Sequence, residues 1–309
     1  MKKDLLTLRD LTADDCEGLF MRSLELKERH AAGIPYRALQ GRILGLIFDK
    51  PSTRTRVSFE AAMVQLGGTS LFLDVQDIQL IRNEPIADTG HVLSRYVDGL
   101  VVRTYSQDLL KELAASASIP VINGLTDLYH PCQVLSDLMT ILEKRGKLEG
   151  LKIVWVGDGN NVAHSWLNAA AVLPLNLVVA CPEGYQPDAV IIESALKDTM
   201  GTIVVISDPK EAVRDADVIY TDVWASMGHE NEQGLRKGFF EPYQVNHNLL
   251  AMAKQDVIVM HCLPAHRGEE ITADILEGAN SVVWDQAENK LHMHKAILER
   301  FISAQRIED

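Results

Sequence analysis

Ile43-Leu44-Gly45-Leu46-Ile47-Phe48 is an apolar run that leads, within a few residues, to Ser52-Thr53-Arg54-Thr55-Arg56. The run has the length and the branched aliphatic residues of a buried strand. From Thr55 the apolar positions recur at helical spacing until Gly67-Gly68, a pair typical of a helix C-terminus. A strand that passes into a helix across a polar turn indicates a parallel α/β architecture.

The polar turn has the composition of an anion site. The first N–H groups of a helix lack intrahelical partners and carry the positive end of the helix dipole, so anions bind there. Ser52 is expected to be the N-cap, and the hydroxyls of Thr53 and Thr55 add hydrogen bonds. Arg54 offers a planar fork to phosphate oxygens. The alternative interpretation is a capped surface helix with solvated arginines, because short motifs also occur by chance.

Short apolar runs alternate with helical patterns along the chain, which is typical of parallel α/β domains. The candidate strands cover residues 43–48, 70–73, 100–103, 119–122, 152–156, 177–180, 203–206, 218–221, 257–260 and 282–284. A long helix is expected from Pro131 to about Arg145. We therefore predict an α/β fold of two domains, each a parallel β-sheet flanked by helices, joined by long interdomain helices. The first domain covers residues 1–135 and is completed by a C-terminal helix over 288–309, and the second covers residues 150–287.

Composition and charge restrict the class of partner. The 309 residues, of which 47% are hydrophobic, are enough for the packed cores of about two domains. The formal net charge of −13 opposes binding to a phosphate backbone, so we expect no nucleic acid partner. No uncharged apolar run approaches membrane-spanning length, and acidic residues interrupt any signal-peptide pattern near the N-terminus. We expect a cytoplasmic protein that binds no membrane.

The four cysteines, Cys16, Cys132, Cys181 and Cys262, are widely scattered and lack CxxC spacing. This pattern argues against a disulfide framework and against a zinc site. We therefore expect no metal ion and no redox cofactor.

Ligands of parallel α/β domains bind beyond the carboxyl ends of the strands, so the residues that follow the strands belong together. They are the turn over 52–56, Arg103, His130-Pro131-Cys132-Gln133, Gly157-Asp158-Gly159-Asn160-Asn161, Asp222 to Gly228 and His261-Cys262-Leu263-Pro264. Singly, each has an ordinary explanation: an ion pair, a buried histidine, a small core thiol or a turn cap. Their shared position favours a single site.

Taken together, these stretches resemble the ornithine carbamoyltransferases over essentially the whole chain. Residues 52–56 and 130–133 are shared with aspartate carbamoyltransferases and identify only the carbamoyl phosphate half. Residues 222–228 and 261–264 discriminate, because an aspartate enzyme typically has His-Pro-Leu-Pro where this chain has His-Cys-Leu-Pro. Enzymes that use putrescine have no amino-acid head group to hold, so Ser226-Met227-Gly228 favours ornithine.

The resemblance implies that residues 1–135 with 288–309 bind carbamoyl phosphate and that residues 150–287 bind ornithine. The implied carbamoyl phosphate ligands are Ser52, Thr53, Arg54, Thr55, Gln79, Arg103, His130, Pro131, Cys132, Gln133, Cys262, Leu263 and Lys290. The implied ornithine ligands are Asn161, Asp222, Ser226 and Met227. Catalytic roles are implied for Arg103, His130, Asp222 and Cys262.

The implied reaction transfers the carbamoyl group of carbamoyl phosphate to the δ-amine of L-ornithine, giving citrulline and phosphate without a cofactor. A related amine such as putrescine is the alternative acceptor. The resemblance also implies a homotrimer in which Gln79 reaches a neighbouring subunit, and a cis peptide bond before Pro264.

Lys290 departs from the family pattern, which usually has an arginine after Ala-Glu-Asn. A lysine offers a point charge and no planar fork, which puts a carbonyl-polarising role in question.

Two other classes of protein remain open from the sequence. A nucleotide-dependent dehydrogenase is the rival enzyme, because Gly157-Asp158-Gly159 follows a strand and Glu183 lies downstream at about the fingerprint spacing. Val162 occupies the place of the third glycine, however, and a dehydrogenase does not explain residues 52–56. A pseudoenzyme or an anion sensor is the non-enzyme alternative.

Overall fold

The computed structural model describes residues 3–74, 84–225 and 233–303. Its contacts divide the chain into two compact units. Unit 1 comprises Met1–Met139 and Glu288–Asp309, and unit 2 comprises Thr140–Ala287. Within the described residues, every helix is too short or too polar to cross a lipid bilayer.

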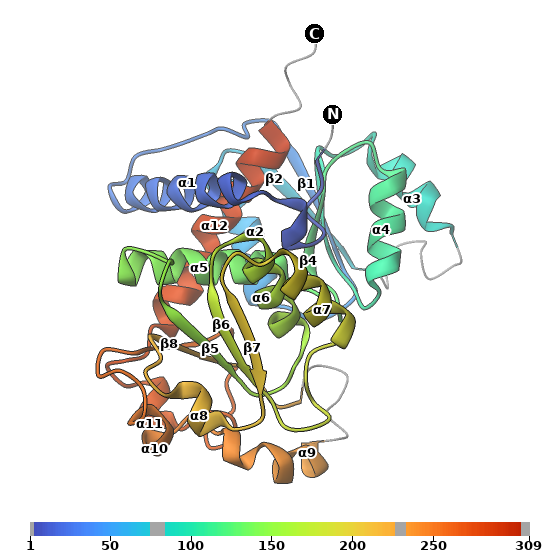
Figure 1. Cartoon of the computed structure of the whole chain (residues 1–309). Coiled ribbons are helices and arrows are strands. Elements are labelled where there is room, and N and C mark those ends of the chain that lie inside the picture. Colours follow the sequence, from blue (N-terminus) through green and yellow to red (C-terminus); the bar gives the residue numbers. More distant parts are fainter. Residues whose placement is uncertain (1–2, 75–83, 226–232, 304–309) are drawn as a thin grey trace. The chain divides into compact units, whose positions relative to one another are not determined.

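Unit 1 is built on a parallel sheet of four strands in the order β2-β1-β3-β4 (Figure 1). The strands are β1 (Ile43–Phe48), β2 (Thr69–Asp74), β3 (Gly99–Arg103) and β4 (Val121–Leu125). The other elements are η1 (Leu8–Asp10), α1 (Ala13–Ala31), α2 (Arg54–Gln65), α3 (Ile86–Leu93), α4 (Gln107–Ser116), the first part of α5 (Pro131–Arg145) and most of α12 (Val283–Ser303).

The unit 1 core forms where the sheet meets α3 and α4. Leu100 and Val102 of β3 and Leu110 and Leu113 of α4 are almost completely buried in one cluster. Each such side chain contributes on the order of 1.5–3 kcal/mol when it leaves water. The central strands β1 and β3 are thereby held rigidly, so the residues that follow them have fixed starting points.

Unit 2 is a parallel sheet of five strands in the order β7-β6-β5-β8-β9 (Figure 1). The strands are β5 (Lys152–Val156), β6 (Asn176–Ala180), β7 (Thr202–Ile206), β8 (Val218–Thr221) and β9 (Ile258–His261). The helices are α6 (Asn161–Val172), α7 (Ala189–Asp198), α8 (Pro209–Val213), α9 (Gln233–Phe240), α10 (His247–Leu250) and α11 (Ala273–Leu276), with the turn η5 (Glu241–Tyr243).

Both sheets contain a point at which the strand order reverses. In unit 1 the neighbours β1 and β3 feed chain segments that depart in opposite directions along the sheet, and in unit 2 the neighbours β5 and β8 do the same. Ligands of open α/β sheets bind at such switch points. The order of the strands therefore brings the turn over 52–56 beside Arg103, and Gly157 to Asn161 beside Asp222.

The predicted α/β fold with parallel sheets is confirmed. One candidate strand is wrong: Val283 and Trp284 open helix α12, which begins before the expected Glu288. A short apolar run does not separate a strand from a buried helical turn by periodicity. The strand predicted at 119–122 begins at Val121, because Pro120 has no N–H to donate to a ladder.

Candidate functional site

The turn after β1 forms a helix N-terminus, as predicted, but its cap differs from the expected one. Helix α2 begins at Arg54, so Thr53 is the capping residue by position, and its side chain makes no capping hydrogen bond. The capping bond comes instead from the preceding residue, because Thr55 N donates to Ser52 Oγ over 3.3 Å. Thr55 is 1% exposed.

The arginines of this turn have different surroundings. Arg56 pairs with Glu60 over 3.0 Å, and its guanidinium lies 3.4 Å from the centre of the Phe72 ring. These contacts hold Arg56 against β2. Arg54 is the first residue of α2, at the helix end where the N–H groups have no intrahelical acceptor.

A second group of polar side chains in unit 1 lies at the ends of β3 and β4. Arg103 is the last residue of β3 and is buried. His130, which directly precedes α5, is also buried, and its pKa lies well below the ordinary value of 6.5. Burial is the main cause, and the charges of Lys290 and Arg103 lower the pKa further. His130 is therefore neutral near pH 7, with one ring nitrogen able to donate and one able to accept.

Three buried polar side chains from α12 and α5 form a hydrogen-bonded chain. Lys290 Nζ donates to Gln133 Oε1 over 2.8 Å, and Gln133 Nε2 donates to Asp137 Oδ1 over 2.8 Å. All three residues are at most 4% exposed. Lys290 and Gln133, both predicted as site residues, are thus brought together, and Asp137 is a partner that the sequence analysis missed.

Pro131 and Cys132 have structural roles at the start of α5. Pro131 is the first residue of α5, where its missing N–H costs no hydrogen bond. The Cys132 thiol donates to Asn123 O over 3.3 Å, and burial raises its pKa to about 12. The thiol is therefore protonated at neutral pH and supports the backbone of β4.

His294 of α12 supports the anion turn from behind, a role that the sequence analysis missed. Its Nδ1 lies 2.9 Å from Ser58 Oγ, and its ring stacks on Phe59 with centroids 3.6 Å apart. Ser58 Oγ also donates to the Arg54 carbonyl over 2.6 Å. In the sequence, His294 is recognisable only as one position on the inner face of a helix.

In unit 2 the Asp222 carboxylate is the centre of a hydrogen-bonded cluster. Its Oδ2 accepts from Asn160 Nδ2 over 2.8 Å, and its Oδ1 accepts from the Val223 amide over 2.9 Å. The Cys262 thiol lies 2.9 Å from the same Oδ1 and donates to it. Asp222 and Cys262, predicted separately, are thus joined directly.

Asn160 is a further member of this cluster, and it is not among the ornithine ligands implied by the family resemblance. Its Oδ1 accepts from the amides of Val162 and Ala163, which makes it the N-cap of α6, while its Nδ2 donates to Asp222. An asparagine directly before an apolar helical stretch is the usual sequence signal of such a cap. The predicted Asn161 is the first residue of α6.

The segment after β9 is fixed by His261. The Leu263 amide donates to His261 Nδ1 over 2.8 Å, so Nε2 carries the ring proton and lies 3.0 Å from Glu270 Oε1. Leu263 has a φ of 59°, in the left-handed region, and the bond from Leu263 to Pro264 is cis, as expected. The strained Leu263 backbone is held by these contacts beside Cys262.

Arg236 is a buried cation near the same turns. Its Nη1 lies 3.0 Å from Asp158 Oδ2 and donates to the Trp224 carbonyl over 2.8 Å. Its guanidinium also lies 5.0 Å from the centre of the Tyr185 ring. Arg236 therefore ties the turn after β5 to the segment after β8.

The glycine turn after β5 does not have the surroundings of a dinucleotide site. A Cβ on Gly159 would lie 2.2 Å from Pro187 N, and Gly159 N donates to the Tyr185 carbonyl over 2.8 Å. In a dinucleotide fingerprint, the corresponding glycine admits a pyrophosphate. Here it admits the chain's own backbone, which disfavours the dehydrogenase alternative.

Asp222, His261 and Cys262 present donor atoms that all lie within 4.8 Å of one another. Both ring nitrogens of His261 are already used, one by the Leu263 amide and one by Glu270. The three side chains are therefore accounted for by hydrogen bonds. Of the remaining predicted site residues, Gln79, Ser226 and Met227 lie outside the described residues.

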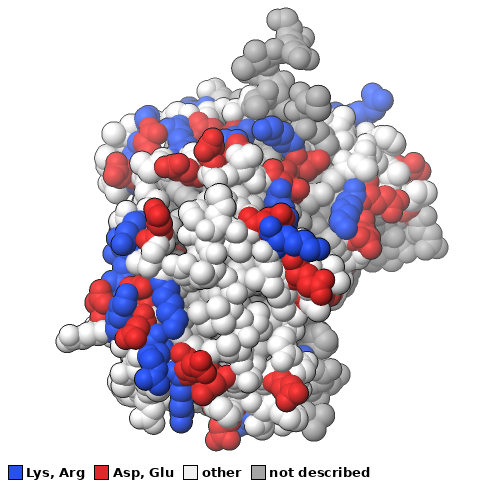
Figure 2. Space-filling model, in the orientation of Figure 1, with Lys and Arg blue, Asp and Glu red and all other residues white. Residues whose placement is uncertain are grey.

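On the face drawn in Figure 2, lysine and arginine side chains are interspersed with aspartate and glutamate. This mixture agrees with an acidic chain whose lysine and arginine side chains lie close to acidic ones.

Two parts of the chain match two domains of one protein family. Residues 3–143 match the carbamoyl-P binding domain of aspartate/ornithine carbamoyltransferases, and residues 149–301 match the Asp/Orn binding domain. The chain is 58% identical over 302 residues to the ornithine carbamoyltransferase of Syntrophus aciditrophicus, an alignment that covers 98% of this chain and 100% of the relative.

Solved structures give the same result. The ornithine carbamoyltransferase of Pyrococcus furiosus superposes with a TM-score of 0.93 at 52% identity, over 98% of this chain and 97% of that one. The anabolic enzyme of Campylobacter jejuni gives a TM-score of 0.91 at 40% identity, over 99% and 100% of the two chains. The chain belongs to the aspartate/ornithine carbamoyltransferase family.

Proposed function

We propose that this chain is an ornithine carbamoyltransferase, which transfers the carbamoyl group of carbamoyl phosphate to the δ-amine of L-ornithine and releases citrulline and phosphate. The observation that carries the proposal is the full-length likeness to enzymes of that name, at 58% identity in Syntrophus aciditrophicus. Putrescine, the alternative acceptor, is not favoured, because the relatives from Syntrophus aciditrophicus, Desulfotalea psychrophila and Pyrococcus furiosus are ornithine carbamoyltransferases.

In this proposal unit 1 binds carbamoyl phosphate. The phosphate lies on the N-terminus of α2, with Ser52, Thr53, Arg54 and Thr55 as its ligands. The first-turn amides and the helix dipole favour an anion there, and the Arg54 fork adds charge-assisted hydrogen bonds.

Arg103 and His130 face the carbonyl oxygen of carbamoyl phosphate. Negative charge grows on this oxygen when the amine attacks, so donors that are already in place stabilise the transition state more than the substrate. The low pKa of His130 leaves a neutral imidazole, which still has one N–H to donate. The fixed charge is supplied by Arg103 and Lys290.

Gln133 receives the amino group of the carbamoyl moiety. Lys290 occupies one lone pair of Gln133 Oε1, and Asp137 accepts from Gln133 Nε2, so the amide is held in one orientation. The second lone pair of Oε1 remains as an acceptor for a substrate N–H. Lys290 thus serves as a positioning residue for Gln133.

Unit 2 binds ornithine through its α-amino and α-carboxylate groups. The ligands in this proposal are Asn161, Asp222, Ser226 and Met227. Asp222 is suited to an α-ammonium group because its carboxylate is already oriented by Asn160 and the Val223 amide. Cys262 and Leu263 are assigned to the carbamoyl group, as in the family.

The reaction begins when the neutral δ-amine attacks the carbonyl carbon, and the tetrahedral intermediate then expels phosphate. An amine with a pKa of about 10.4 is unprotonated in only about one molecule in two thousand at pH 7. The proton must therefore be removed before or during attack. The candidates for handling this proton are the departing phosphate and Asp222, the latter either directly or through the Cys262 thiol that donates to it.

The decisive experiment is a citrulline assay with purified protein, carbamoyl phosphate and L-ornithine, with putrescine in place of ornithine as the matched comparison. Citrulline formation at a kcat/KM far above that for putrescine is the expected result. Absence of turnover with a folded protein would favour the anion-sensor alternative. The proposal extends to a homotrimer located in the cytoplasm, and sedimentation equilibrium of the purified protein tests the trimer.

A further inference from the structure

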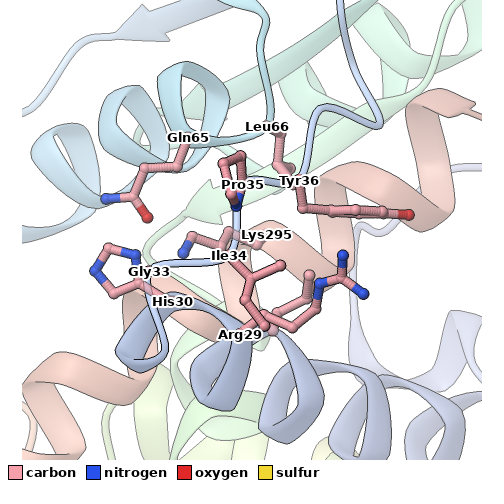
Figure 3. Close-up of a pocket in the computed structure, with 10 residues that line it drawn as sticks. Arg29, His30, Gly33, Ile34, Pro35, Tyr36, Gln65, Leu66 and Lys295 are labelled. Atoms are coloured by element: carbon pink, nitrogen blue, oxygen red, sulfur yellow. The ribbon is translucent and has the colours of Figure 1, made fainter.

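Unit 1 contains a cavity of about 270 Å³ whose lining includes none of the residues assigned to the two substrates (Figure 3). It is formed by the end of α1, the loop over residues 33–36, the end of α2 and Lys295 of α12. The volume lies just below the range of about 300–1,000 Å³ that is typical of small-molecule sites. The cavity therefore suits a ligand smaller than a nucleotide.

Lys295 is the unusual residue of this cavity. Its side chain is 3% exposed, and no hydrogen bond or ion pair joins its ammonium to another residue in the part of the chain that the structure describes. Figure 3 shows this ammonium directed toward the space between the Gln65 amide and the His30 ring. Burial lowers the pKa of Lys295 to about 8, so the group is still mostly charged at pH 7.

A buried charge without a partner costs free energy, which a counter-ion in the cavity would recover. The nearby carboxylates already have other partners. Glu299 accepts from Arg22 over 2.7 Å and from the Tyr36 hydroxyl, and Glu25 pairs with Arg22 and Arg29. These two carboxylates therefore do not neutralise the Lys295 ammonium.

Other polar atoms around the cavity also lack partners. Arg29 Nε and Gln65 Oε1 are buried and make no hydrogen bond with a described residue. His292, behind the wall, lies 5.6 Å from His30 between ring centroids, and burial and Lys295 lower its pKa to about 3. His292 is therefore neutral at pH 7. The uncompensated positive charge at the cavity comes from Lys295, because the Arg29 guanidinium pairs with Glu25 and lies over the Tyr36 ring.

The remaining walls are apolar. Leu26, Ile34, Pro35 and Leu66 line the cavity beside the cations. A cationic end next to aliphatic walls matches a molecule with an anionic head and a short hydrocarbon body.

We propose that this cavity is a binding site for a small carboxylate with a short apolar body, whose carboxylate pairs with the Lys295 ammonium beside Gln65 and His30 and whose body contacts Leu26, Ile34 and Leu66. The site is separate from the proposed carbamoyl transfer and does not depend on it. Phosphate shares the negative charge but has no apolar body to bury, so it binds more weakly.

Calorimetric titration of the full chain with butanoate at pH 7, in phosphate-free buffer, tests the proposal. We expect saturable binding that is at least tenfold weaker in Lys295→Met, which removes the charge and keeps the hydrocarbon stem. The matched control is Lys111→Met, because Lys111 is an exposed lysine that pairs only with Asp108 on its own helix. Binding should be unchanged in that control.

A second variant keeps the test decisive if Lys295→Met does not fold. Ile34 is 51% exposed at the cavity, so Ile34→Trp can fill the space without disturbing the core. We expect Ile34→Trp to weaken butanoate binding at least tenfold and to retain the melting temperature of the parent. Absence of saturable butanoate binding, binding that survives Lys295→Met or Ile34→Trp, or equal affinity for inorganic phosphate would each overturn the proposal.

Discussion

Lys290 Nζ donates a hydrogen bond of 2.8 Å to Gln133 Oε1, and this bond joins the C-terminal helix to the first turn of α5 within unit 1. The family usually has an arginine at this position. The lysine reaches Gln133 as a point donor, so its effect on a carbonyl oxygen is exerted partly through the orientation of the Gln133 amide.

Replacement of Lys290 by methionine should therefore disturb carbamoyl phosphate more than ornithine. Loss of one charged hydrogen bond to a buried acceptor costs about 1–3 kcal/mol, so kcat/KM for carbamoyl phosphate should fall by roughly tenfold to a hundredfold. Steady-state kinetics with each substrate varied in turn measures the split. Lys290→Arg keeps a donor and should retain most of the activity. A loss as large as that of Lys290→Met would show that the site is built around lysine.

Arg54→Lys retains the charge at the start of α2 and removes the planar fork. If Arg54 binds phosphate oxygens in a bidentate manner, the variant should lose most of its activity and bind carbamoyl phosphate more weakly. Arg56→Lys is the matched control, since Arg56 is engaged by Glu60 and Phe72. Calorimetric titration measures the affinity of each variant for carbamoyl phosphate. An affinity equal to wild type would exclude Arg54 from contact with the phosphate.

Asp222→Asn changes a carboxylate that accepts from three donors into an amide that has only one acceptor oxygen. The new NH2 group then faces either Asn160 Nδ2 or the Val223 amide and the Cys262 thiol. A donor meets a donor in both cases, so the hydrogen-bonded cluster is disrupted. We expect kcat/KM for ornithine to fall by at least a hundredfold, while carbamoyl phosphate binding to unit 1 stays within about twofold. Equal losses for both ligands would contradict the assignment of Asp222 to ornithine.

His130 and His294 should make the fold sensitive to mild acid. Burial holds the pKa of both imidazoles well below 6.5, so the folded chain leaves them neutral where the unfolded chain protonates them. Their contribution to stability is complete above about pH 6.5 and is lost as the pH falls toward their folded pKa values. Urea unfolding at pH 7.5 and pH 5.5 should show the decrease. NMR signals of either ring that titrate near pH 6.5 in the folded protein would refute this explanation.

Gly159→Ala should destabilise unit 2, because the added Cβ would meet the Pro187 backbone at 2.2 Å. Such a contact requires a backbone shift that costs on the order of 1–3 kcal/mol. Gly234→Ala is the matched control, since a Cβ there meets no atom of a described residue within 4 Å. Thermal unfolding monitored by circular dichroism compares the two. Equal melting temperatures of the two variants would mean that the turn after β5 accommodates the added Cβ without strain.

The alternation of apolar runs with helical patterns was sufficient to predict parallel sheets, because buried parallel strands are short and almost uniformly apolar. It failed at Val283, where the same pattern opens a helix. The candidate site was predictable where a side chain directly follows a strand, as for Arg103 and Asp222. A partner that approaches from a distant segment, such as His294 behind α2, depends on tertiary packing that a single sequence does not encode locally.

The stacking of His294 on Phe59 has a consequence for the order in which the protein is made. The anion turn, residues 52–56, precedes unit 2 in the sequence, but α12, which carries His294, follows unit 2. During translation, the first strands and helices of unit 1 are synthesised before unit 2, and they lack α12 until unit 2 has been synthesised. The anion turn therefore lacks the support of His294 until α12 has been synthesised.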